Sequence, residues 1–297
     1  MIYDLRHLTT YRYQAPVSFT RCALRLSPAD TASQHLLKNE IQITPPPATT
    51  AGRTGAFGER VLAVTVETPH RELKIEARSR VSVTRRILPD DQGSPAWERV
   101  RDAACAARSL DFASPAHFLF PTPMTPLLDA FTNYGRDCFA GGAPILAAAK
   151  SLSERIHRDF AYDPKATVVT TPAIKAFAAR RGVCQDFAHI MIAALRGLGL
   201  PTAYVSGYLR TTPPPGKPRL QGADATHAWI SLWCGEDLGW IDFDPTNALV
   251  VGDEHIELAV GRDYADVAPI DGVILGGGEQ AVSVAVDVVP VESPRAA

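Results

Sequence analysis

Residues 182–187 read Gly-Val-Cys-Gln-Asp-Phe, and two later segments complete a pattern: Thr-His-Ala-Trp at 226–229 and Trp-Ile-Asp-Phe-Asp-Pro-Thr at 240–246. Within one stretch of chain these segments supply a thiol (Cys184), an imidazole (His227) and a carboxylate (Asp244). A weak nucleophile becomes reactive when a base takes its proton and a third group holds that base in one tautomer. The three side-chain types together predict acyl-transfer chemistry.

The thiol is predicted to stand at the start of a helix. Apolar residues follow Cys184 at spacings of three and four, and glycines and a proline end this stripe at 197–201. A shorter helix is predicted before it, with Thr171 as N-cap, Pro172 at the first helical position and Gly182 at its end. A helix start favours an anion, because unpaired backbone N–H groups and the positive end of the dipole meet there.

Composition limits the partners and the compartment. The 297 residues are 46% hydrophobic and 21% charged, and 30 Lys+Arg against 32 Asp+Glu gives a net charge of −2, so no nucleic-acid partner is predicted. Neither a signal-peptide pattern nor an apolar run of about 18 residues occurs, so we expect a cytoplasmic protein with no membrane partner. The five cysteines lack any Cys-x-x-Cys pair, which argues against a disulfide framework and leaves the four cysteines besides Cys184 as small apolar side chains.

The hydrophobic pattern divides the chain into three parts. Residues 1–88 alternate as short strands and predict a β-sandwich-like domain. Residues 89–250 predict an α+β catalytic core, with helices at 103–110 and 145–160 and strands at 203–209, 227–233 and 240–243. Residues 251–297 are predicted as C-terminal strands that return to the N-terminal β domain, with alternation at 281–289 after a glycine hairpin turn at 276–278.

The three segments resemble the transglutaminase-like cysteine enzymes of the papain-like superfamily. Weaker flanking motifs look like the bacterial members that carry an N-terminal β domain. These motifs are His7-Leu8-Thr9-Thr10-Tyr11-Arg12-Tyr13, Leu24-Arg25-Leu26-Ser27-Pro28, Val205-Ser206-Gly207-Tyr208 and Gly261-Arg262-Asp263-Tyr264. The resemblance implies a papain-like core, in which a Cys-bearing helix packs on an antiparallel sheet, and a Cys184-His227-Asp244 triad.

Two carboxylates compete for the orienting role. Asp242 lies two residues before Asp244 and shares its sheet face if the strand extends that far, and an Asp before Pro is also turn chemistry. Trp240 and Thr246 match the family pattern around Asp244, and the resemblance therefore favours Asp244.

Side chains near the nucleophile have secondary predicted roles. Gln185 and Tyr162 are candidate oxyanion or supporting groups, although backbone N–H groups at the helix start could serve instead and packing is the alternative for Tyr162. Asp186 is assigned to stabilising the helix N-terminus. His189 is assigned a structural role, because its spacing from Cys184 turns it off the same helix face.

Other chemistries fit less well, and neither a metal nor a cofactor is predicted. A zinc site could use Cys184, His227 and Asp244, but no paired-ligand spacing occurs. A serine hydrolase motif around Ser206 lacks its first glycine. The prediction is a cysteine peptidase or amidase acting on a peptide or protein amide. Transamidation to an amine and a non-catalytic peptide-binding scaffold are the alternatives, and the oligomeric state is left open.

Overall fold

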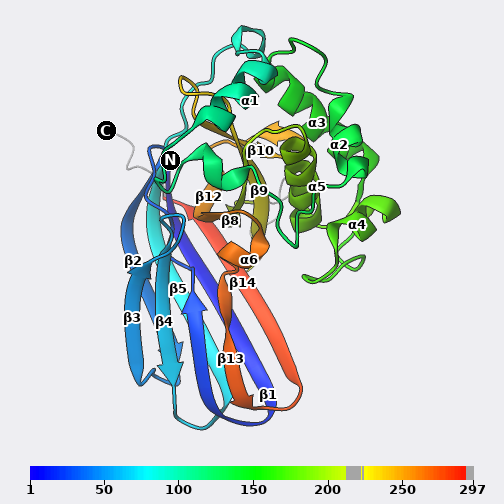
Figure 1. The fold of residues 1–297 in the computed structure, drawn as a ribbon. Helices are drawn as coiled ribbons and strands as arrows, with labels where there is room; N and C mark the ends of the chain where they lie inside the picture. The colour runs from blue at the N-terminus through cyan, green and yellow to red at the C-terminus, as the bar shows by residue number, and fades with distance from the viewer. Residues whose placement is uncertain (212–221, 223, 292–297) are drawn as a thin grey trace, which may run out of the picture.

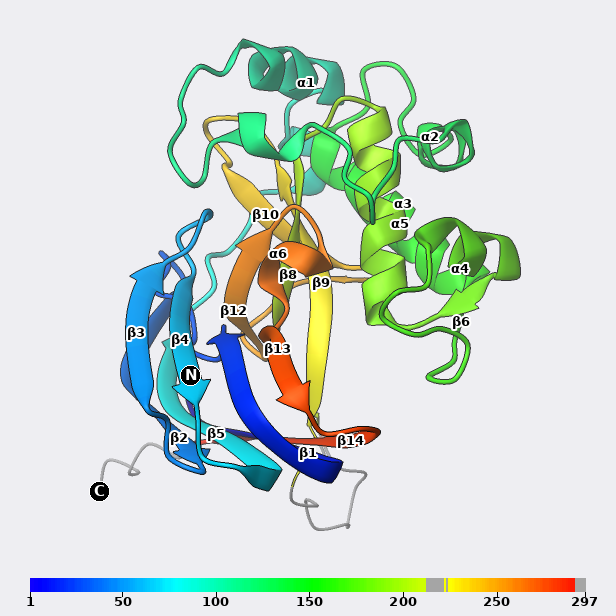
Figure 2. The same ribbon diagram turned by 60° about the horizontal axis from the view of Figure 1, so that its bottom comes forward.

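The computed structural model describes residues 1–211, 222 and 224–291, which form an α+β fold (Figure 1). A long β layer forms one end of the molecule, and helices gather around a second sheet at the other (Figures 1 and 2). Among the described residues, no helix is both long and apolar enough to cross a membrane.

The first sheet, called the N-terminal sheet below, has strand order β2-β5-β1-β4-β3, and both β13 and β14 also pair with β1. Its strands are β1 (Ile2–Leu24), β2 (Gln34–Thr44), β3 (Thr49–Thr54), β4 (Arg60–Val66), β5 (His70–Val83), β13 (Ile270–Gly276) and β14 (Gln280–Pro290). The first of these, β1, is a single strand of 23 residues, longer than the short strands predicted for residues 1–88. The register against β5 shifts between Arg12 and Val17, which lets one strand join two groups of partners.

This shared strand explains the sandwich-like character of the sheet. The first half of β1 pairs with β5 and β14, while its second half pairs with β4 and β13. Val64 and Val66 of β4 belong to the same buried apolar cluster as Leu73 and Ile75 of β5. The two groups of strands thus bury their apolar faces against each other, as alternating strands require.

The C-terminal segment serves both sheets. Residues 281–289 lie in β14 and pair with β1, and the turn before them is made by three glycines whose φ angles are 95°, 92° and 63°. Residues 255–261 depart from the prediction, because they form β12 (His255–Gly261) and pair with β8 in the second sheet. Strand alternation shows that a segment is a strand, but it does not identify the partner sheet.

The second sheet, called the core sheet below, is antiparallel with order β11-β10-β9-β8-β12. Its other strands are β8 (Thr202–Leu209), β9 (Ala225–Trp233), β10 (Trp240–Asp244) and β11 (Leu249–Val250). Helix α5 (Cys184–Gly197) packs against β8 and β9, and its apolar residues lie in the largest buried cluster of the described chain. Tyr208 and Ile256 of the core sheet pack with Tyr3 and Leu5 of the N-terminal sheet.

The remaining helices belong to the same end of the molecule as α5 (Figure 2). They are α1 (Trp97–Ala106), α2 (Asp129–Arg136), α3 (Ile145–Asp159), α4 (Ala173–Ala179) and α6 (Tyr264–Val267), with two short 3₁₀ turns, η1 (Asp91–Gly93) and η2 (Pro115–Phe118), and a two-strand pair, β6 (Ala161–Tyr162) and β7 (Arg181–Gly182). The helix predicted at 103–110 thus begins earlier, and α2 was not predicted at all.

The helix before the thiol ends differently from the prediction. Pro172, rather than Thr171, is the N-cap of α4, and Arg180, at φ 53°, is its left-handed C-cap. The Arg180 guanidinium lies over the rings of Phe160 and Phe177, contacts that stabilise this unusual backbone conformation.

Candidate active site

The start of α5 holds Cys184 in a fixed place. The Asp186 carboxylate Oδ2 accepts hydrogen bonds from the Val183 N–H at 2.9 Å and from the Thr167 hydroxyl at 2.6 Å. A Cβ on Gly182 would lie 2.6 Å from that Oδ2, so only glycine allows this approach. Asp186 therefore stabilises the helix start as predicted, and Cys184 stands partly exposed at the first helical position.

His227 and Asp244 come from neighbouring strands of the core sheet. His227 lies near the start of β9 and Asp244 at the end of β10, and Nε2 of the ring is 2.7 Å from Oδ2 of the carboxylate. Cys184 lies close enough to the ring to raise the pKa of His227. Since Asp244 occupies Nε2, Nδ1 is the ring nitrogen left for the thiol.

The electrostatics of this arrangement favour a charged ring. Burial by itself lowers the pKa of His227, but hydrogen bonds to Asp244 and Cys184, together with their negative charges, outweigh it and raise that pKa to about 10. A cationic ring beside the thiol stabilises a thiolate, which is the nucleophilic form of cysteine.

Asp244 is the fully buried carboxylate that the site is built around, at 0% exposure. Oδ1 accepts from the backbone N–H groups of Thr246 and Asn247, while Oδ2 accepts from the Asn247 side-chain amide as well as from His227. Burial tends to raise the pKa of Asp244, yet the hydrogen bonds and the charge of His227 lower it below its ordinary value. One side chain thus bonds both to the backbone of the turn and to the His227 ring.

The rival carboxylate has other partners. Asp242 Oδ2 accepts from Nε1 of Trp229 at 3.3 Å and lies 3.8 Å from Nη1 of Arg85. Within the described part of the chain, Asp242 forms no hydrogen bond with the His227 ring. The structure therefore brings Asp244, and not Asp242, to His227.

A further histidine lies at the site. His255, the first residue of β12, is 3% exposed, and its Nε2 is 3.1 Å from the same Asp244 Oδ2 that His227 contacts. No role is predicted for His255 from the sequence, because it stands in a segment assigned to the N-terminal β domain. The sequence feature that could have indicated a role for His255 is its position at the start of an apolar strand soon after Asp244.

The three groups His227, Asp244 and His255 are close enough to be considered as metal ligands. The two ring nitrogens lie 2.7 and 3.1 Å from the carboxylate oxygen, whereas ligands on a tetrahedral zinc, each about 2.0–2.1 Å from the ion, lie about 3.3 Å apart. Asp244 Oδ2 also accepts from Asn247. These distances are those of hydrogen bonds, and the residues fit a hydrogen-bonded cluster better than a zinc site.

The two candidate supporting residues lie close to the thiol in different ways. The Gln185 side-chain amide donates to the backbone carbonyl of Val169 at 3.0 Å, and so holds the segment that precedes α4. Tyr162 is 57% exposed and packs edge-on against Phe187. A contribution of either side chain to an oxyanion site remains a prediction.

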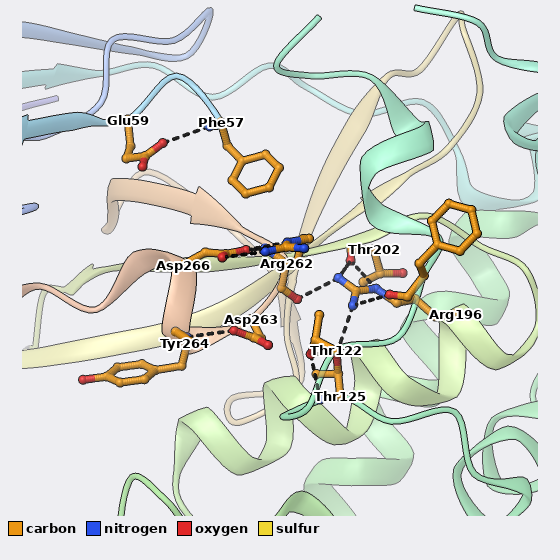
Figure 3. A network of polar contacts seen from close by, with 12 residues as sticks. Phe57, Glu59, Thr122, Thr125, Arg196, Thr202, Arg262, Asp263, Tyr264 and Asp266 are labelled. Carbon is orange, nitrogen blue, oxygen red and sulfur yellow. Dashed lines mark hydrogen bonds and ion pairs between the residues drawn. The ribbon is translucent and has the colours of Figure 1, made fainter. Parts of the chain in front are cut away.

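The far end of α5 is fixed by a buried arginine (Figure 3). Arg196 donates to the backbone carbonyls of Thr202, Arg262 and Phe120 and to the hydroxyl of Thr125. These contacts tie α5 to the start of β8, to the turn after β12 and to the segment near η2. The helix that carries the thiol is therefore anchored at both ends.

The same network places the Gly261-Arg262-Asp263-Tyr264 motif. The Asp263 carboxylate caps α6 by accepting from the Ala265 N–H at 2.8 Å, and the Tyr264 N–H donates to Nε2 of His189 at 3.3 Å. Burial and, to a smaller extent, the charge of Arg196 together lower the pKa of His189 to about 3. His189 is thus a neutral structural group, consistent with the role assigned from the sequence.

Comparisons with known proteins agree with this architecture. Residues 3–82 match the bacterial transglutaminase-like N-terminal region, and residues 132–245 match the transglutaminase-like superfamily. An uncharacterized protein of Mycobacterium tuberculosis is 37% identical over 301 residues, covering 98% of this chain and 93% of the relative. An uncharacterized protein of Mycobacterium leprae is 31% identical over 289 residues, covering 95% and 96%.

One solved structure shares the whole fold. The crystal structure of a "Putative Cysteine Protease" from Cytophaga hutchinsonii superposes with a TM-score of 0.76 over 100% of this chain and 92% of that one, at 21% identity. At this identity the likeness establishes the fold alone. Taken with the two family matches and the full-length relatives, it shows that the chain belongs to the transglutaminase-like superfamily, with the bacterial N-terminal region of that family.

Proposed function

We propose that the protein is a cysteine peptidase or amidase that cleaves an amide bond through an acyl-enzyme on Cys184. The observation that carries the proposal is the hydrogen bond of 2.7 Å between His227 Nε2 and Asp244 Oδ2, and the influence of Cys184 on the pKa of the same ring supports it. A nucleophile, a base and an orienting carboxylate then stand in sequence, each within reach of the next.

The chemistry follows from these positions. The Cys184 thiol gives its proton to His227, and the sulfur attacks the amide carbonyl carbon. The carbon–nitrogen bond then breaks as His227 returns the proton to the leaving nitrogen. Asp244 holds the imidazole in one orientation and stabilises its cation in both steps.

Deacylation completes the cycle. A water molecule gives a proton to His227 and attacks the acyl carbon, and the carbon–sulfur bond breaks as the sulfur takes back the proton. A primary amine in place of water would make a new amide. We favour water, because the sequence contains no calcium-loop pattern of the kind that could support a regulated transamidase.

The test is an acyl-transfer assay on the full chain. A peptide library is incubated with the protein, with and without a primary amine, and the products are read by mass spectrometry. We expect hydrolysed peptides from the wild type and none from Cys184→Ala. Amine-tagged peptides as the main product would make the protein a transamidase.

Cys105 offers a matched control, because it is the exposed cysteine of the described chain. Cys105→Ala removes an exposed thiol of α1 and is expected to keep full turnover. An acyl probe that labels Cys184 no faster than Cys105 in the wild type would instead support the peptide-binding scaffold.

A further inference from the structure

His255 makes a contact that the proposed mechanism does not yet use. Its Nε2 lies 3.1 Å from Asp244 Oδ2, and its ring packs edge-on against Trp229 with ring centroids 5.2 Å apart. Two imidazoles from different strands therefore converge on a single carboxylate oxygen.

The chemistry of the acceptor fixes the tautomer of His255. An ionised carboxylate can only accept, so the proton of a neutral His255 ring must be on Nε2. Nδ1 is then a bare acceptor, and it is buried with no hydrogen-bond partner in the described structure. An apolar side chain would avoid this unsatisfied group, so packing alone does not explain a histidine here.

The backbone around His255 is also held in place. Nη2 of Arg85 donates to the His255 carbonyl at 3.2 Å, and the His255 N–H donates to the carbonyl of Gly252 at 3.3 Å. The ring is thus fixed from both sides, by its backbone and by Trp229, with Nε2–H directed at Asp244.

We propose that His255 is a positioning residue, which fixes Oδ2 of Asp244 and through it the orientation of the His227 ring. This inference rests on the proposed function, since it assigns a role within the same site. The charged and titratable groups that surround the cluster are Cys184 from α5, His227 from β9, Asp242 from β10, Arg85 from the segment after β5, and Glu257 from β12.

Two substitutions of His255 by side chains of equal length distinguish a positioning role from a packing role. His255→Gln retains a side-chain N–H donor, while His255→Met fills a similar volume without one. The readout is the rate of iodoacetamide labelling of Cys184 across pH, with thermal melting to report folding. We expect His255→Met to label about tenfold more slowly at neutral pH, the effect of losing one hydrogen bond to a charged group, and His255→Gln to restore most of the rate.

The pH dependence of Cys184 labelling should shift as well. A less firmly held carboxylate stabilises the His227 imidazolium less, so the labelling curve of His255→Met is expected to move to higher pH. A shift to lower pH would mean that His255 competes with His227 for Asp244, and it would overturn the proposal. Equal rates for the Gln and Met variants would overturn it too.

Controls keep this result separate from the proposed function. His7→Met removes another buried histidine, 2% exposed, that makes no contact with Asp244, and it should leave the labelling curve unchanged. If wild-type Cys184 labels no faster than Cys105, the proposed function fails. If wild type labels rapidly and His255→Met does the same, only the role of His255 fails.

Discussion

Two buried histidines in different regions of the molecule have opposite charge preferences. His7 lies between the N-terminal sheet and the core sheet at 2% exposure, and its ring bonds to the hydroxyls of Tyr208 and Thr9. His227 lies at the candidate active site at 8% exposure and bonds to Asp244. Burial lowers the pKa of His7 to about 4, whereas the pKa of His227 is raised to about 10.

The difference lies in the partners rather than in the burial. Hydroxyl groups satisfy the ring without compensating a charge, so the interface keeps a neutral histidine. A buried carboxylate supplies that compensation, and Asp244 is itself held by backbone and side-chain donors. The same residue type is therefore neutral in one region and charged in the other.

The largest expected effect is on turnover. Cys184→Ala should abolish it, because the substitution removes the proposed nucleophile. Stability should change by only about 0.5–1.5 kcal/mol, since little volume is lost. Product mass spectrometry and thermal melting measure the two quantities. Residual turnover in this variant would place the nucleophile elsewhere.

Asp244→Asn should make the environment of His227 resemble that of His7. Breaking a buried ion pair costs about 3–5 kcal/mol, and here the loss should depend on pH. The His227 contribution is full below the unfolded pKa of about 6.5 and is lost as pH rises through about 10. The Asp244 contribution is full above about pH 3.9 and is lost as pH falls through its lowered pKa.

The stability gap between wild type and Asp244→Asn should therefore be widest between about pH 4 and 6.5. Urea unfolding across pH measures it. A gap of constant size from pH 4 to 10 would contradict the assigned charges.

The smallest effect is expected at the interface. His7→Met should cost about 1–3 kcal/mol near neutral pH, because the Tyr208 hydroxyl loses its partner. In the wild type, the stability contributed by neutral His7 is present above about pH 6.5 and lost as pH falls through about 4. The variant should lack this acid-side loss in urea unfolding. An unchanged acid-side slope would show that His7 does not titrate as its surroundings require.

Much of the site could be predicted from local sequence. Helix signals after Cys184 and strand signals around His227 and Asp244 depend on nearby residues, so α5, β9 and β10 appear where the pattern indicated. The role of Asp186 at the helix start also depends on residues nearby in the sequence.

Other features depend on partners distant in sequence. His255 reaches Asp244 only because β12 joins β8 in the core sheet, and strand alternation contains no information about that choice. The left-handed C-cap of α4 is Arg180, whose guanidinium contacts aromatic rings from other elements. The prediction from Gly182 therefore placed the end of this helix two residues too late.

The most direct test of the central claim is the pH profile of iodoacetamide labelling at Cys184 in wild type and His227→Ala, with the exposed Cys105 as reference in the same molecule. The wild type should label rapidly near pH 7, because the cationic ring stabilises the thiolate. His227→Ala should label slowly there and recover only as pH approaches the free-thiol value of roughly 8.5, following Cys105. Coincident Cys184 profiles in the two proteins would contradict the coupling of His227 to the thiol, and with it the proposed activity.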